Sequence, residues 1–227
     1  MSAGQSPLEW AARERQKARK GVRRKVLAWA GLNQAAKDAD ALTVRAKHGA
    51  VGEQRTAAML AQLPAGWTVF HGRKLPGYSN DYDHVLGSPC GNAVVALDTK
   101  RWHAGRETTL IRGRVHCGRE DRHGQIEAVA RYAARLQQAL NLPGVVVWPL
   151  LVVHGSRISS PPFPAGRLEA PVQVKGRGGA VVWSGVVHVL GPEYLVPTPA
   201  SAPREAHPAR AGALVRHVDR VLPRPPG

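Results

Sequence analysis

An acid and an amine, Asp98 and Lys100, are separated by one threonine at the end of the apolar segment 93–97. Side chains alternate along a strand, so residues two apart share a face and these two point the same way. A further carboxylate, Asp83, lies 15 residues upstream, before a turn rich in Gly, Ser and Pro. If the chain folds back as an antiparallel hairpin centred on 90–91, paired positions sum to 181 and Asp83 lies opposite Asp98. Two carboxylates and a lysine then converge, as binding a divalent cation and a phosphate requires.

The composition favours a globular domain with a polyanionic partner. The chain has 227 residues, of which 43% are apolar, and this predicts one domain with a real core and tails. Lys and Arg total 32 against 16 Asp and Glu, a formal charge of +16. Such an excess indicates nucleic acid as the leading partner, with an anionic membrane surface second.

The sequence predicts no membrane span and a cytoplasmic location. The longest apolar segment, 145–153, has nine residues and contains Pro149, whereas a spanning helix needs about 20. The N-terminus lacks a basic-then-apolar signal sequence, and two cysteines are too few for a disulfide framework.

Residues 1–48 form a basic leader in which eight positive charges fall within residues 13–25. Its richness in Ala, Arg, Lys, Gln and Glu favours helix over much of its length. The alternative is a solvated arm that aids solubility, but the total charge favours contacts to phosphates, which need no defined sequence. The residues proposed for these contacts are Arg19, Lys20, Arg23, Arg24 and Lys25.

The central part of the chain predicts helices and strands in the order helix, three strands, a connection, helix, strand. Apolar spacing indicates helices over 49–63 and 122–140 and strands over 67–75, 82–86, 93–100 and 145–153, with a strand or hairpin at 107–115. The resulting fold class is α/β, with a mixed central sheet flanked by helices.

Beyond residue 154 the amino-acid composition changes: 12 of the 18 prolines fall in residues 161–226. We expect short strands at 172–174, 181–183 and 186–190, and an amphipathic helix containing Leu214, Val218 and Val221. The predicted division is an extension over 1–48, a core over 49–154, further strands packing on it over 155–191, and a Pro-rich tail over 192–227.

Four signals occur in order along the core: Gly-Glu at 52–53, Asp-His at 83–84, Asp-Thr-Lys at 98–100 and Gln125. With them the chain resembles the nuclease-related domain (NERD) family, a branch of the PD-(D/E)xK nuclease superfamily, over residues 49 to about 154. Asp98 stands where the family's acid-x-Lys signal usually has Glu, and the interval from Asp83 to Asp98 is about two residues longer than usual. The superfamily admits either acid, and a two-residue insertion preserves strand parity.

The resemblance implies a restriction-endonuclease-like core and a Mg²⁺-dependent site, with Mn²⁺ as an alternative ion. The implied ligands are Asp83 and Asp98, with Glu53 binding a metal-bound water or a second ion. Lys100 would hold the attacking water and the scissile phosphate, acting first as a charge stabiliser. The resemblance also implies that Gln125 orients the nucleophile or contacts phosphate.

Each residue also has a purely structural interpretation. Asp98 and Lys100 alone would suit a strand-end salt bridge, and Asp83 could be a turn acid, with Asp81 replacing it as ligand from the same face. Glu53 could pair with Arg55 or Arg101, and Gln125 could be an exposed helix residue. Four histidines cluster in sequence around these residues, with Cys117 beside one of them, but they lack zinc-ligand spacing: His84, His103, His116 and His123. His84 is taken as structural.

The residues after the acid-x-Lys signal, Arg101 and Trp102, are further candidates for nucleic-acid contact. Trp102 could stack on a base or sugar, although packing in the core is the preferred interpretation.

The function predicted from the sequence is a Mg²⁺-dependent nuclease acting on DNA. Two alternatives stay open: a nuclease-like DNA-binding protein with weak or no turnover, and an accessory module that recruits a processing protein through its Pro-rich C-terminal part.

Overall fold

The computed structural model describes residues 49–79, 81–176, 178–201 and 205–224. The basic leader over 1–48 and its five proposed phosphate contacts lie outside these residues. The first described helix covers residues 49–60. The elements that follow are β1 (Thr68–Lys74), β2 (Asp81–Gly87), β3 (Ala93–Arg101), β4 (Glu107–Ile111), β5 (Arg114–Cys117), β6 (Glu120–Asp121), α4 (His123–Leu140), β7 (Val146–His154), β8 (Arg157–Ile158), β9 (Arg167–Lys175), β10 (Val181–Leu190), η1 (Pro192–Tyr194), α5 (Pro197–Ala200) and α6 (Pro208–Val221).

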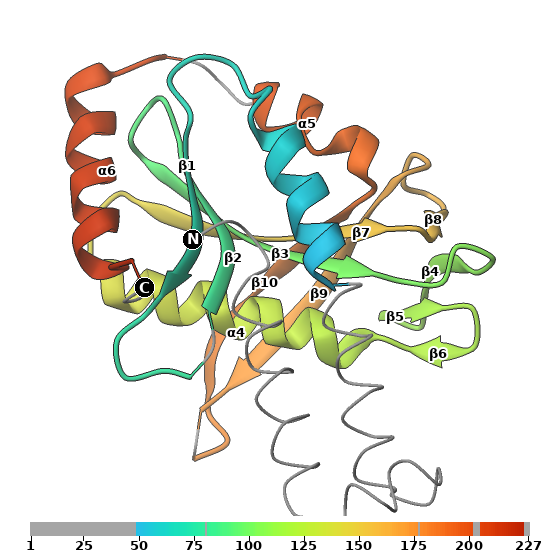
Figure 1. Ribbon diagram of the computed structural model, residues 1–227. Helices are drawn as coiled ribbons and strands as arrows, with labels where there is room; N and C mark the ends of the chain where they lie inside the picture. The colour runs from blue at the N-terminus through green and yellow to red at the C-terminus, as the bar shows by residue number, and fades with distance from the viewer. Residues whose placement is uncertain (1–48, 80, 177, 202–204, 225–227) are drawn as a thin grey trace, which may run out of the picture.

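Within the described residues, the main sheet has six strands in the order β1-β2-β3-β7-β10-β9. β7 runs parallel to both β3 and β10, and the other neighbours are antiparallel. The parallel pair β3 and β7 is joined through α4, as a parallel connection requires. The predicted order of elements and the mixed α/β sheet are therefore confirmed (Figure 1).

The hairpin of β2 and β3 has the predicted register. Its pairs run from Gly87 with Val94 to His84 with Leu97, and every pair sums to 181. Asp83 and Asp98 are the next positions along the two strands. The short turn fixes this register, and a slip by one residue would place the two carboxylates on opposite faces of the hairpin.

Helices cover the two faces of the main sheet (Figure 1). On one face, α4 and α6 pack on Val85, Val94 and Ala96. On the other face, Leu60 of the first helix packs against Val95 and Leu97 together with Leu195. Alternate residues of β3 thus enter different cores, because successive side chains point to opposite faces of a strand.

A second sheet, with the order β6-β5-β4-β8 among the residues described, lies beyond the end of β3. β4 and β5 form the predicted hairpin, with Arg112 at φ 49° and Gly113 at φ 77° in its two-residue turn. Two successive positive φ values are characteristic of the tight turn that matches strand twist.

The C-terminal strands are longer than the sequence indicated. The segments 181–183 and 186–190 are one strand, β10, with an irregularity in pairing between Val181 and Trp183. The prediction of two strands was wrong because Ser184 and Gly185, which look like a break, keep their pairing with β9.

The amphipathic helix near the C-terminus is confirmed as α6, which buries Leu214 and Val218. Arg73 of β1 fixes the C-terminal end of α6. Its guanidinium lies 2.7 Å from the Asp219 carboxylate and donates a hydrogen bond to the Leu222 carbonyl. Among the described residues, no helix has both the length and the apolar character to cross a membrane.

Candidate active site

Asp83 and Asp98 meet at the end of the β2–β3 hairpin. Both line a cavity of about 10 Å³, together with Asp81 and with Val129 and Tyr132 of α4. This volume is about that needed for one water molecule or one small ion. The Thr99 backbone N–H donates a 2.8 Å hydrogen bond to Asp83 Oδ2, which fixes the carboxylate beside β3. Burial and the nearby Asp98 raise the pKa of Asp83 well above its ordinary value.

Lys100 lies on the same face as Asp98, and its Nζ is 2.5 Å from Asp98 Oδ2. Burial alone would lower the pKa of Lys100, but the carboxylates of Asp98 and Asp83 outweigh it and raise the pKa. The ammonium group therefore stays charged at neutral pH. It suits the stabilisation of negative charge and does not suit the role of a base.

Glu53 comes from the opposite layer, in the first helix. Burial raises the pKa of its carboxyl, the Lys100 charge opposes that shift, and the charges of Asp98 and Asp81 add to it. Glu53 thus belongs electrostatically to the same group as the hairpin residues. The structural alternative of a pair with Arg55 or Arg101 is not realised among the ion pairs of the described residues.

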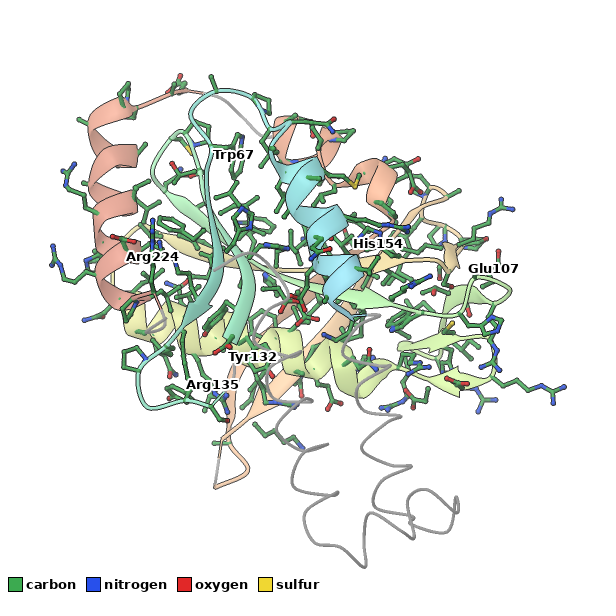
Figure 2. All side chains as sticks on the ribbon, viewed as in Figure 1. Trp67, Glu107, Tyr132, Arg135, His154 and Arg224 are labelled. Atoms are coloured by element: carbon green, nitrogen blue, oxygen red, sulfur yellow. The ribbon has the colours of Figure 1, made fainter. Side chains whose placement is uncertain are left out.

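The first helix is positioned by residues that the sequence did not single out. Thr99 Oγ1 donates to Thr56 Oγ1 at 3.2 Å, and Thr56 Oγ1 is 2.8 Å from His154 Nε2 of β7, which lies beside this helix (Figure 2). Gly52 permits the close approach, since a Cβ there would be 3.3 Å from Thr99 Cγ2. Apolar spacing predicted this helix, but periodicity gives no signal for contacts between residues 98 positions apart, so these contacts were not predicted.

His84 is buried and faces away from Asp83, as the sequence indicated. Its Nδ1 is 2.8 Å from Nδ1 of His71, its partner on β1. Burial and the neighbouring His71 lower the pKa of His84 to about 3. Both rings are held neutral, with one Nδ1 donating and the other accepting, so this pair joins β1 to β2 behind the carboxylates.

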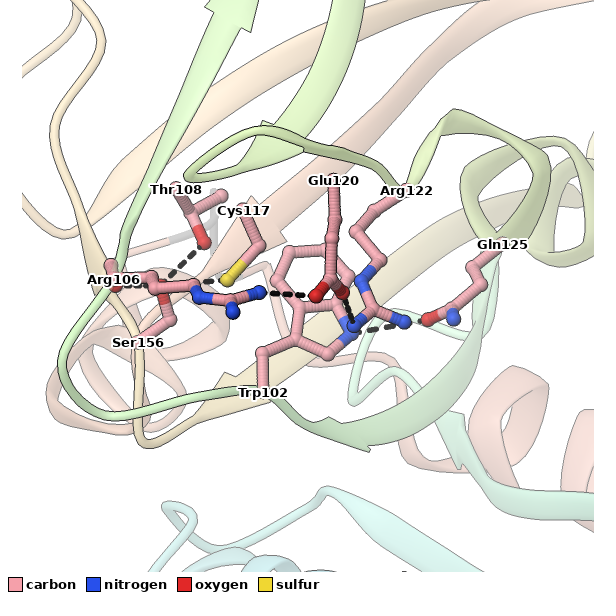
Figure 3. A network of polar contacts seen from close by, with 8 residues as sticks. All are labelled: Trp102, Arg106, Thr108, Cys117, Glu120, Arg122, Gln125 and Ser156. Carbon is pink, nitrogen blue, oxygen red and sulfur yellow. Dashed lines mark hydrogen bonds and ion pairs between the residues drawn. The ribbon is translucent and has the colours of Figure 1, made fainter.

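Gln125 and Trp102 form one structural unit at the start of α4. Trp102 Nε1 donates a 3.0 Å hydrogen bond to Gln125 Oε1, and the Arg122 guanidinium lies 6.0 Å from the centroid of the indole ring (Figure 3). The Trp102 side chain is only 6% exposed and packs in the core. The candidate role of Trp102 in nucleic-acid contact is therefore corrected in favour of packing, since a buried ring has no free face for a base.

Figure 3 also shows the polar contacts that stabilise the region between the second sheet and the start of α4. Glu120 pairs with both Arg106 and Arg122, and Ser156 Oγ donates to the Arg106 carbonyl at 2.7 Å (Figure 3). Ser156 Oγ is also 2.7 Å from Thr108 Oγ1. These contacts attach the second sheet to the turn after β7, through Ser156, and to the start of α4, through Arg122. Arg101, next to Lys100, is exposed and available to a phosphate.

The donor set determines which ion the site suits. No group of three or more His, Cys, Asp or Glu side chains within the described residues is arranged to hold a metal. Mg²⁺ commonly takes one or two carboxylates and fills its other positions with waters and substrate phosphate. Asp83 and Asp98, crowded around one small cavity, fit that requirement.

Comparison of the chain with known protein families agrees with this geometry. An α/β core with carboxylates and a lysine at the end of a sheet hairpin is the arrangement of a nuclease-like protein. Residues 48–154 match the family model of the nuclease-related domain, so this part of the chain is similar to that family. No curated protein and no solved structure matches the chain at a significant level.

Proposed function

We propose that this chain is a metal-dependent nuclease that hydrolyses phosphodiester bonds, with DNA as its expected substrate and Mg²⁺, or alternatively Mn²⁺, as its ion. The observation that carries the proposal is the convergence of Asp83 and Asp98 on one small cavity, with the charged Lys100 2.5 Å from Asp98. The match of residues 48–154 to the family model of the nuclease-related domain supports it.

Asp83 and Asp98 would hold the ion, which when bound polarises the phosphate and makes water a better nucleophile. Lys100 keeps its positive charge and stabilises the charge that develops on the phosphoryl oxygens. Thr99 fixes Asp83 through its backbone N–H, so the carboxylate does not need to reorient. Glu53, with its raised pKa, accepts a hydrogen bond or a proton from the attacking water.

Incubation of the purified chain with DNA and Mg²⁺ tests the proposal. We expect Asp98→Asn to lose at least about 10²-fold in cleavage rate, because it removes a charge on which the transition state depends, and Lys100→Ala to lose a similar factor. Asp121→Asn and Lys175→Ala are matched controls, since both residues are exposed and neither lines the cavity. No cleavage by the wild type, or cleavage by the two site variants at the wild-type rate, contradicts the proposal.

A nuclease-like binding protein without turnover is the second candidate. It is favoured by one observation: Lys100 already occupies an oxygen of Asp98, which suits a structural ion pair. Calorimetric titration with Mg²⁺ separates the two functions. The nuclease predicts heat that disappears in an Asp83→Asn, Asp98→Asn double variant, whereas the inactive scaffold predicts the same trace for both proteins.

A further inference from the structure

A groove of about 530 Å³ lies remote from the carboxylates. It lies between α6 and the turn that follows α4, where α6 crosses the C-terminal end of α4 (Figure 1). One side is basic and contains Arg210, Arg216 and Arg220, all exposed. No acidic side chain is among the residues that line the groove.

The three arginines have no carboxylate partner in the described ranges. Asp219, the acid on the same helix, is engaged by Arg73 of β1 instead. The groove therefore carries three positive charges without a carboxylate partner, which favours an anionic ligand. Guanidinium groups bind phosphate oxygens through two parallel hydrogen bonds, which suits a ligand with several phosphates.

The remaining lining is largely apolar, with Leu142, Pro143, Val145 and Leu214 among its residues. A closed duplex presents phosphates and buries its bases, so it would leave this surface unused. A single nucleic-acid strand offers both phosphates and the less polar faces of sugars and bases. The composition of the groove therefore favours a single strand.

The groove is rigid because both ends of α6 are fixed. At its start, Gly91 has φ 70° and lies so close that a Cβ would be 2.5 Å from the Arg210 carbonyl carbon. At its end, Arg73 binds Asp219 and the Leu222 carbonyl. A surface held in this way binds without ordering a segment first, which lowers the cost of association.

The distance from the carboxylates sets a length for the ligand. Val129 of α4 lines the small cavity, and α4 ends at Leu140 beside the groove. Eleven residues of helix span about 17 Å. At the 3.4 Å spacing of stacked nucleotides, this separation corresponds to about five nucleotides.

We propose that the groove holds the phosphates of a single nucleic-acid strand about five nucleotides from the bond that is cut. This inference rests on the proposed function for its substrate class. The groove then acts as an anchoring site that strengthens binding of strands long enough to reach both places, and a shorter strand gains only part of this stabilisation.

The test measures binding of a fluorescent 12-nucleotide and a four-nucleotide DNA strand by anisotropy, in EDTA so that no cleavage occurs. The variant is Arg210→Gln, Arg216→Gln, Arg220→Gln. We expect at least a tenfold weaker affinity for the 12-mer at low salt. We also expect a slope of log affinity against log salt that is shallower by about 2, since each phosphate contact on a single strand contributes about 0.7. Affinity for the four-nucleotide strand should fall by a smaller factor, because this strand offers fewer phosphates to the arginines.

A matched control removes three exposed positive charges at the other edge of the molecule: Arg157→Gln, Arg167→Gln, Lys175→Gln. It should change 12-mer affinity by less than threefold. Ala213→Glu, which places a negative charge in the groove and leaves the arginines intact, is a second variant in case the triple substitution disturbs folding. It should also weaken 12-mer binding selectively.

An unchanged 12-mer affinity in both groove variants overturns the inference, as does an equal loss for the two strand lengths or for the control. The proposed function fails by a different result, namely equal cleavage by Asp98→Asn and wild type. Because binding is measured without metal, that result leaves the groove measurement intact.

Discussion

The two faces of β3 carry different properties on the same nine residues. One face presents Val95, Leu97 and Thr99 to the first helix, where they are buried in an apolar and hydroxyl-bonded layer. The other presents Asp98 and Lys100 to the side of α4, beside Asp83. The first face packs without conflict, whereas the second crowds like charges whose ionised forms burial disfavours.

The difference shows how this strand can hold an electrostatically unfavourable site. The apolar face and the contacts of Thr99 with Thr56 fix the backbone, and the same Thr99 presents its N–H to Asp83. Stability and chemistry are therefore separated by the alternation of side chains, and substitutions on the two faces should have opposite consequences.

The largest expected effect on stability belongs to the packing face. Leu97 is 2% exposed, and Leu97→Ala should lower the free energy of unfolding by about 2–5 kcal/mol, because it leaves a cavity against Leu60. Asp98→Asn, one residue away, should change that free energy by less than about 1 kcal/mol. Urea denaturation measures both values.

Cleavage assays complete this comparison under conditions in which both variants are folded. Leu97→Ala should then retain the wild-type rate, whereas Asp98→Asn should lose it. A folded Leu97→Ala protein without activity would mean that the two faces are not separable.

The next largest expected effect is a pH dependence of the free energy of unfolding, which arises from the His71–His84 pair. The folded state holds the pKa of His84 at about 3, while an unfolded histidine titrates near 6.5, so the unfolded state takes up the proton first. The stability from this pair is complete above about pH 6.5 and is lost as the pH falls from there towards 3. The slope is up to about 1.4 kcal/mol per pH unit. Urea denaturation at several pH values in this range measures it.

His84→Gln retains a polar side chain beside His71 but does not titrate, so it should flatten this fall. His103→Gln is the matched control, because His103 is exposed and distant from the pair, and it should keep the wild-type slope. A wild-type slope in His84→Gln would assign the pH dependence to other groups.

The smallest expected effect concerns Asp83, on the face of the sheet that carries the carboxylates. Its contribution to stability changes with pH in the opposite direction to that of His84. Because the pKa of Asp83 is raised in the folded state, its ionisation costs stability as the pH rises above the ordinary pKa. Asp83→Asn keeps an acceptor for the Thr99 N–H and removes the charge, so the free energy of unfolding at neutral pH should rise by about 1 kcal/mol. Thermal denaturation at pH 5 and pH 8 should show a larger gain at pH 8. A loss of stability at both pH values would show that the charge is well accommodated.

Local sequence patterns were enough to predict much of the fold of this protein. The apolar segment before Asp98 and the turn at 87–91 determined the hairpin and its register, because strand alternation and a short turn leave one pairing. The 3.6-residue spacing of Ile126, Val129 and Ala133 determined α4, and glycine and asparagine marked its end. The order of Glu53, Asp83, Asp98, Lys100 and Gln125 indicated a nuclease-related core before any contact was known.

Other features depended on contacts between distant parts of the chain, for which a sequence pattern carries no information. The Thr56–Thr99–His154 contacts, the engagement of Gln125 by Trp102 and the raised pKa of Lys100 all require three-dimensional proximity. The same holds for the groove, whose arginines come from α6 and whose apolar lining comes partly from a turn nearly 70 residues earlier. Sequence determined which residue types were present and on which face of each element they lie. The tertiary structure alone decided which of them share a low-dielectric environment, and burial and charge proximity set their chemistry there.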